Sequence, residues 1–265
     1  MQLFIQFARM CGAEGGHGLV GAMVANQFDR DLPGLAQRLK NLRRCLRLIA
    51  FAKIRQVVPQ AKLESFAGDL ADAIVVEKLV KRFPAVDILI NNLGIFEPKP
   101  FEEIPDADWV RFFEVNVLSG VRLSRAYLPK MKSKNWGRIV FISSESGIQI
   151  PAEMIHYGMT KTAQLAVSRG LAETCGGTGV TVNAVLPGPT HSDGVDEFVT
   201  KLSGGKPFAE FEQEFFKNHR PSSLLQRFAT TEEVANLVVY LSSPLSSATN
   251  GAALRVDGGV VRACF

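Results

Sequence analysis

The sequence predicts an α/β fold, a single domain on a doubly wound parallel sheet of the Rossmann type. Apolar runs at residues 86–91, 138–143, 180–186 and 252–256 indicate buried strands. Helical patterns lie between these runs, and strands that alternate with helices are typical of parallel βαβ units. A chain of 265 residues with 46% hydrophobic and 21% charged residues suits one such domain, so residues 1–265 are expected to form it.

The first half of this pattern begins with the strand at 86–91, which ends in a polar turn. A helix is predicted over 106–132, with Asp106 as its N-cap and one apolar stripe along its length. The next strand, 138–143, leads to a helix predicted over 157–173. The connections alternate as βαβ units require.

The second half continues with the strand at 180–186. Thr230-Thr-Glu-Glu233 has the pattern of a capping box and predicts a helix that runs through Leu241. The last strand is expected at 252–256. In this architecture ligands bind beyond the carboxyl ends of the strands. Asn91, Ser144 and Pro187 fall at such ends, so they are expected to meet in one crevice.

Tyr157 and Lys161 carry the clearest chemical signal, because residues four apart share one helix face. A nearby ammonium favours phenolate, so Lys161 is expected to lower the pKa of Tyr157, as general acid–base catalysis requires. Ser144, at the strand end, is expected to donate to the oxygen whose proton Tyr157 handles. A surface helix pair would explain this spacing alone, but the strand, Ser144 and the intervening loop favour catalysis.

Several motifs resemble the short-chain dehydrogenase/reductase family, particularly its 3-oxoacyl-acyl-carrier-protein reductase-like members. They are Gly137-Arg-Ile-Val-Phe-Ile-Ser-Ser144 with Tyr157-Gly-Met-Thr-Lys161, Asn91-Asn-Leu-Gly94, Val115-Asn116-Val117, Val182-Asn-Ala-Val-Leu-Pro187-Gly188 and Val256-Asp-Gly-Gly259. The motifs keep the family's order from about Asp69 to the C-terminus. The resemblance implies a Rossmann-like fold and NAD or NADP as cofactor. It also implies hydride transfer to or from a small-molecule carbonyl or secondary alcohol.

The resemblance implies roles for single residues. Tyr157 is expected to transfer the proton, Ser144 to orient the substrate oxygen, and Lys161 to bond the nicotinamide ribose. Asn116 is expected to hold a water that connects Lys161 to solvent. The cofactor-binding residues are expected to be Asp69, Asn91, Gly94, Tyr157, Lys161, Pro187, Gly188 and Thr190. For Asp69 a helix-capping role is the alternative.

The run Cys11-Gly12-Ala-Glu-Gly-Gly16-His-Gly18 has the glycine spacing of the family's pyrophosphate loop. Gly12, Gly16 and Gly18 are expected to let the backbone approach the cofactor at a helix N-terminus. The surrounding residues fit the family poorly, since the candidate second strand at 46–51 carries no terminal acid. Three alternatives to a pyrophosphate loop stay open for residues 1–53: a glycine-rich surface loop, a diverged segment, or a shifted reading frame. The choice between NAD and NADP depends on this segment and also stays open.

Residues 191–225 are expected to form a lid over the substrate, with helices at 195–202 and 208–218. Gly204 and Gly205 are candidate hinges. The phenylalanines of the lid recur at helical spacing, which favours packing over substrate contact.

Charge and hydropathy restrict the partners of this chain. A net charge of +4 is mild, and outside residues 38–47 the basic residues are scattered, so nucleic acid is not an expected partner. No apolar run approaches the roughly 18 residues of a membrane span, so no membrane association is expected. Surplus apolar residues on the helices at 106–132 and 157–173 predict a homo-oligomer, in particular a homotetramer.

The cysteines are Cys11, Cys45, Cys175 and Cys264, and their spacing fits no metal site. Reduced thiols, a cytoplasmic location and the absence of a metal are therefore expected. Two other functions stay open. One is a non-catalytic protein of the same fold with an impaired cofactor site, and the other is a lyase or epimerase that uses the cofactor transiently.

Overall fold

The computed structural model describes residues 51–52, 54–192 and 207–264 of the chain. In this part a sheet has the strand order β1-β2-β3-β6, and every pairing in it is parallel. Its strands are β1 (Ile88–Asn91), β2 (Gly137–Ile142), β3 (Val180–Pro187) and β6 (Ala253–Val256). The predicted α/β class with a parallel central sheet is confirmed.

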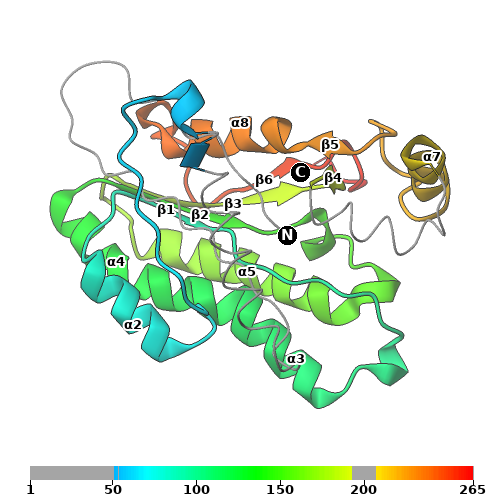
Figure 1. Ribbon diagram of the computed structural model, residues 1–265, viewed down its shortest axis with the longest axis horizontal. Helices are drawn as coiled ribbons and strands as arrows, with labels where there is room; N and C mark the ends of the chain where they lie inside the picture. Colours follow the sequence, from blue (N-terminus) through cyan, green and yellow to red (C-terminus); the bar gives the residue numbers. More distant parts are fainter. Residues whose placement is uncertain (1–50, 53, 193–206, 265) are drawn as a thin grey trace.

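Helices cover both faces of this sheet (Figure 1). One face carries α2 (Ala73–Arg82), α4 (Ser119–Lys134) and α5 (Ile155–Glu173), and the other carries α8 (Thr231–Ser242). Ile139 and Phe141 of β2 belong to the core under α4, whereas Val140 and Ile142 pack with Val234 of α8. Because side chains alternate across a strand, burial of both faces requires the continuous apolar run seen in the sequence.

The helix predicted over 106–132 consists of three pieces. They are α3 (Asp106–Phe113), a π-helical turn, η3 (Glu114–Leu118), and α4. The prediction of Asp106 as N-cap is wrong, because the extended Pro105 occupies that position and Asp106 is the first helical residue. Proline has a fixed φ and no N–H to lose, and the carboxylate of Asp106 suits the positive end of the helix dipole.

Other element boundaries agree with the sequence patterns. Thr230 caps α8 in a capping box, with its Oγ1 accepting from the Glu233 backbone N–H at 3.2 Å. The helix α7 (Phe208–Asn218) has the predicted bounds. The strand predicted at 46–51 is wrong at Phe51, its one described residue, which is helical and contacts the Arg55 guanidinium one turn later. The helix at 195–202, the glycines Gly204 and Gly205, and the glycine loop lie outside the described residues.

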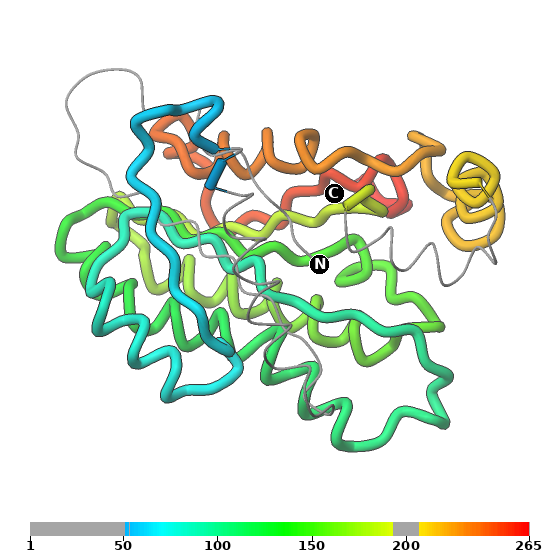
Figure 2. Tube along the Cα trace, in the orientation of Figure 1, coloured from blue at the N-terminus to red at the C-terminus, as the bar shows by residue number. Residues whose placement is uncertain are grey.

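The carboxyl ends of β1, β2 and β3 lie at one edge of the sheet, as parallel pairing requires. Beyond this edge β4 (Thr190–His191) pairs in parallel with β5 (Ala229–Thr230). The chain trace in Figure 2 shows α7 beside this small sheet, past the ends of the long strands. The described part of the predicted lid, which includes α7, thus lies at the edge where ligands of such folds bind.

Candidate active site

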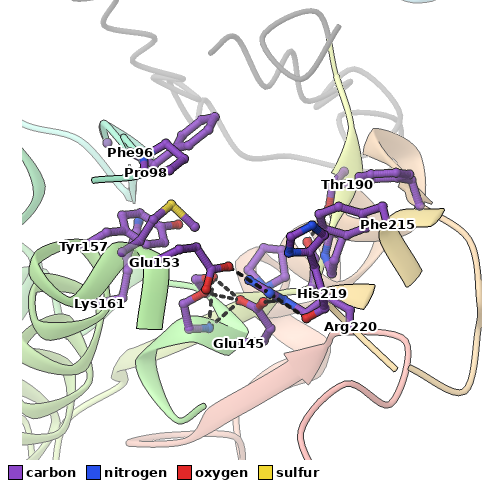
Figure 3. Close-up of a pocket in the computed structure, with 18 of the residues that line it drawn as sticks. Phe96, Pro98, Glu145, Glu153, Tyr157, Lys161, Thr190, Phe215, His219 and Arg220 are labelled. Carbon is purple, nitrogen blue, oxygen red and sulfur yellow. Dashed lines mark hydrogen bonds and ion pairs between the residues drawn. The ribbon is translucent and has the colours of Figure 1, made fainter. Parts of the chain in front are cut away.

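A cavity of about 460 Å³ opens at this edge of the sheet. Its walls come from the loop after β1, the β2–α5 connection with the start of α5, the residues after β3, and α7 with the residues that follow it. Figure 3 shows Tyr157 and Lys161 on one side, with Phe215, His219 and Arg220 across from them. The cavity therefore lies between the sheet edge and the predicted lid.

The structure brings most of the predicted site residues together around this cavity. The lining includes Ser144, Tyr157, Lys161, Gly94, Pro187, Gly188 and Thr190. Asn116, Asn91 and Asp69 are not among the described residues that line this cavity. Asn92 and Glu153 line the cavity and were not predicted as site residues. Asn92 is the neighbour of Asn91 in the same motif, so the motif indicated the place but not the residue that faces the cavity.

Burial shifts the pKa values of Tyr157 and Lys161 in opposite directions. It lowers the pKa of Lys161 to about 7, because a buried ammonium loses its hydration. Burial raises the pKa of Tyr157 well above its ordinary value. The hydrogen bond with Ser144 lowers this pKa, the carboxylate of Glu145 raises it, and the guanidinium of Arg220 lowers it. The Lys161 Nζ lies 5.5 Å from the Tyr157 ring centroid. The pKa of Tyr157 is therefore raised and not lowered as predicted, because loss of hydration is the largest influence on the phenol.

Asn116 lies in the π-helical turn η3, and its side chain is fully bonded. Its Oδ1 accepts from the Ile95 backbone N–H at 2.8 Å, and its Nδ2 donates to Ile95 O at 3.0 Å and to Thr160 Oγ1 at 2.9 Å. Asn116 thus joins the loop after β1 to the helix that carries Tyr157. A π-helical turn often marks a functional position within a helix.

Gln164 is a site residue that sequence reasoning missed. Its Nε2 donates to the Asn116 carbonyl at 2.5 Å, and its Oε1 lies 3.4 Å from the Lys161 Nζ. The ammonium also donates to the Ile142 carbonyl at 2.9 Å. The Gln164 side chain therefore links the Lys161 ammonium to the backbone of Asn116. The only signal was a polar residue one helical turn beyond Lys161, on the inward face.

Ser144 follows β2, and its hydroxyl is held by the residue that comes next. The Ser144 Oγ donates to Glu145 Oε2 at 2.5 Å and accepts from the Ser146 N–H at 3.1 Å. The Glu145 Oε1 accepts from Arg220 Nε at 3.0 Å. Glu145 is therefore buried, ion-paired with Arg220 and in direct contact with the predicted catalytic serine.

Two glycines of the predicted cofactor site differ in why they must be glycine. A Cβ on Gly188 would lie 2.5 Å from the Asp257 carbonyl oxygen, so close packing against the turn after β6 explains this glycine. A Cβ on Gly94 would meet Lys161 Nζ at 3.4 Å and Asn116 Oδ1 at 3.6 Å. Gly94 therefore keeps the space beside the ammonium open to a ligand.

The remaining predicted cofactor residues lie outside the cavity wall or outside the described residues. Asn91 is buried and its Nδ2 donates to Ser124 Oγ at 3.2 Å. Asp69 accepts from the Ala71 N–H at 3.0 Å, a contact that suits the capping alternative. The glycines Gly12, Gly16 and Gly18 are not described. The residues present thus fit the nicotinamide and ribose end of a dinucleotide, through Tyr157, Lys161 and the open space at Gly94.

Within the described residues, no group of three or more histidine, cysteine, aspartate or glutamate side chains is placed to hold a metal ion. The same part of the chain contains no helix that is long and apolar enough to cross a membrane.

Comparison with known proteins decides the family. Residues 53–261 match a family model described as enoyl-(acyl carrier protein) reductase. The chain belongs to this short-chain dehydrogenase/reductase family. It is 51% identical over 208 residues to an uncharacterised oxidoreductase, YvaG of Bacillus subtilis (strain 168), which covers 78% of this chain and 79% of that protein.

Two further relatives have named activities. D-beta-hydroxybutyrate dehydrogenase of Cupriavidus necator is 30% identical over 218 residues, which is 80% of this chain and 83% of that protein. The crystal structure of L-sorbose reductase from Gluconobacter frateurii, in complex with NADPH and L-sorbose, superposes with a TM-score of 0.74. It is 26% identical and covers 81% of this chain and 82% of that one. Both lie in the family that the sequence motifs indicated.

Proposed function

We propose that this protein reduces a carbonyl substrate to a secondary alcohol with NADH or NADPH, with Tyr157 as the general acid. As a member of its family the chain is an oxidoreductase that uses NAD or NADP. The observation that carries the proposal is the meeting of Ser144, Tyr157 and Lys161 on one cavity that also has Gly94 and Thr190 on its wall. When bound, the nicotinamide supplies the hydride that the carbonyl carbon receives.

The protonation state of Tyr157 supports reduction of a carbonyl, the direction of the reaction in which this residue acts as an acid. Its raised pKa keeps the phenol protonated at neutral pH, so it can donate a proton to a carbonyl oxygen. Proton donation leaves a buried phenolate, and in this proposal it is stabilised by the Lys161 ammonium, whose Nζ lies 5.5 Å from the centroid of the Tyr157 ring. Ser144 lies beside Tyr157 and orients the same oxygen. Lys161 also bonds the nicotinamide ribose in this proposal.

The substrate class is a small carbonyl compound. The relatives that support it are named for a hydroxybutyrate and for L-sorbose. The cavity wall combines aromatic side chains with a few polar ones, which suits a small molecule with one or two hydrogen-bonding groups. Substrate identity beyond this class depends on α7 and the residues that follow it.

Coenzyme titration tests the proposal directly. NADH and NADPH are titrated separately while protein fluorescence is recorded, and the coenzyme that binds is used with a panel of 3-oxoacyl thioesters, ketoses and simple ketones. We expect binding of at least one coenzyme and its oxidation by a member of the panel. Failure of both coenzymes to bind would contradict the proposal.

The alternative of a non-catalytic protein with the same fold lacks support, because Ser144, Tyr157 and Lys161 are all present on one cavity. A lyase or epimerase would use the coenzyme transiently. Net formation of NADH or NADPH from a secondary alcohol separates a dehydrogenase from these enzymes.

We propose a homotetramer as the assembly and the cytoplasm as the location. Two of the surplus apolar residues on the helix predicted over 106–132, Phe112 and Tyr127, are fully buried within one chain, so they do not support the tetramer. Val110 and Phe113 of α3 remain exposed at 63% and 38%, and they offer an apolar surface for a second copy. Light scattering at micromolar concentration checks the assembly, and a monodisperse monomer would contradict it. Cell fractionation checks the location.

A further inference from the structure

Glu145 is a buried carboxylate whose two oxygens face different parts of the chain. Its Oε2 accepts hydrogen bonds from Ser144 Oγ at 2.5 Å and Ser146 Oγ at 2.7 Å. Its Oε1 accepts from Arg220 Nε at 3.0 Å. Both ionic side chains are nearly inaccessible, with exposed fractions of 5% for Glu145 and 10% for Arg220. One carboxylate therefore joins the hydroxyl of Ser144 to a guanidinium 75 residues away in sequence.

Arg220 lies just after α7 and is held in place by several further contacts. Its Nη1 donates to the His219 carbonyl at 2.8 Å and to Glu153 Oε1 at 3.2 Å. Its guanidinium carbon lies 5.9 Å from the ring centroid of Phe215. Figure 3 shows the guanidinium pointing from the α7 side of the cavity toward Glu145 and Glu153. The position of this end of α7 is thus coupled to the residue that bonds Ser144.

The charges argue against Arg220 as a receptor for an anionic substrate. Two carboxylates, Glu145 and Glu153, already bond the one guanidinium. A buried carboxylate without its cation would be costly, because it would lose its hydration with nothing in return. Glu145 therefore depends on Arg220, and the guanidinium is occupied by the protein itself.

Ser144 has one hydroxyl proton, and Glu145 Oε2, 2.5 Å from the hydroxyl, competes for it with the phenol oxygen of Tyr157. To donate to a substrate oxygen, the hydroxyl must turn away from the carboxylate. A carboxylate that shares its charge with Arg220 is a weaker acceptor than an unpaired one, so Arg220 eases this turn. The two groups also oppose each other at Tyr157, where Glu145 raises the pKa of the phenol and Arg220 lowers it.

We propose that Glu145 and Arg220 form a positioning pair for Ser144. The pair sets the direction in which the Ser144 hydroxyl points and how readily it can donate to the substrate, and it makes both properties depend on the position of α7. The proposal rests on the proposed function, because it assigns the pair an effect on the same reaction. It adds two residues that contact neither coenzyme nor the reacting carbon in this account.

A double-mutant cycle tests the pair, with kcat and KM measured on the panel substrate that wild type turns over. Arg220→Gln leaves Glu145 unpaired, so we expect kcat to fall by about tenfold or more with a smaller change in KM. Glu145→Gln in that background removes the unpaired charge, so the double variant should regain activity over Arg220→Gln. The kcat of the double variant should therefore be about tenfold higher than the product of the two single-variant effects predicts.

The pH profile supplies a readout that a purely structural pair would not move. In Arg220→Gln the loss of activity at alkaline pH, where the Tyr157 phenol gives up its proton, should move to higher pH, because the guanidinium lowers the pKa of that phenol. It should return in the double variant, which also lacks the carboxylate that raises this pKa. The other charged or titratable groups on the described wall of this cavity are unchanged in each protein, namely Lys161, Glu153, Glu214 and His219. Independent losses that multiply in the double variant, with one common pH profile, would overturn the proposal.

Controls separate folding and the proposed function from the pair. Arg82→Gln removes an exposed arginine–glutamate contact of 3.2 Å on α2, and its kinetics should equal wild type. If circular dichroism shows that Arg220→Gln does not fold, Arg220→Lys and Glu145→Asp carry the same cycle with both charges kept. If wild type turns over substrate and the effects of the two substitutions are additive, the positioning pair is contradicted and the proposed function is not. A wild type without turnover defeats the proposed function, and the pair falls with it.

Discussion

At the scale of single residues, burial acts on both partners of the predicted catalytic pair. Removal from water penalises the charged form of either group, so the phenol of Tyr157 keeps its proton and the ammonium of Lys161 releases its own more readily. The sequence predicted only the attraction between ammonium and phenolate, because spacing reports proximity and not the depth of the cavity. The protonated phenol is what a general acid in reduction requires.

Lys161→Met tests the shift at Lys161 through the pH dependence of stability. The pKa of Lys161 is lowered from 10.5 in the ordinary state to about 7 in the fold. Between these values the unfolded chain binds more protons at Lys161 than the folded chain does, so the free energy of unfolding of wild type rises with pH. Below about pH 7 both states are protonated, and the cost of burying the ammonium is full and constant. The rise from pH 7.5 to 9.5 should exceed that of the variant by on the order of 2 kcal/mol in urea unfolding. Parallel stability curves for the two proteins would show that Lys161 is not shifted.

At the scale of elements, a helix or strand could be predicted where the residues that determine it lie close together in the sequence. The strands and the capping box of α8 follow from patterns within a few residues, and the structure confirms them. The π-helical turn at Asn116 interrupts the predicted apolar stripe, because Val110 and Phe113 before it are exposed whereas Val117 within it is buried. The predicted periodicity assumed one regular helix and gave no sign of this turn. The ion pair between Glu145 and Arg220 joins segments 75 residues apart, and no local pattern connects them.

Thr230→Ala tests the capping box as a local cause of α8. The substitution removes the side-chain oxygen that accepts from the Glu233 N–H, so the free energy of unfolding should fall by about 1 kcal/mol. Thr231→Ala is the matched control, because the neighbouring threonine is the first helical residue and not the cap. Denaturant unfolding measures both variants. Equal losses in the two variants would remove the cap as the explanation.

At the scale of the whole molecule, one edge of the sheet gathers the ends of the strands, the start of α5 and α7 around a single cavity. This convergence could be predicted, because parallel strands place their carboxyl ends together. The choice of Asn92 over Asn91 as a lining residue could not, since it depends on which way each side chain turns after β1. The glycine loop at residues 12–18 lies outside the described part, so its role stays a prediction.

Gly18→Val tests that loop. If Gly12, Gly16 and Gly18 approach the pyrophosphate, a side chain at position 18 should raise the coenzyme dissociation constant by tenfold or more, since it blocks the backbone. Gly15→Val is the matched control, because Gly15 occupies a free position of the spacing. Calorimetric titration with NADH and NADPH measures both. Tight wild-type binding that Gly18→Val leaves unchanged would remove the loop assignment and leave the fold intact.

The central claim is that Tyr157 donates the proton in the reaction, and Tyr157→Phe tests it most directly. The change removes one hydroxyl, so coenzyme affinity by calorimetry should stay within about twofold while kcat falls about 10²–10⁴-fold. Tyr240→Phe, on the exposed side of α8, is the matched control and should keep wild-type kcat. A Tyr157→Phe protein whose kcat lies within about twofold of wild type would contradict the account.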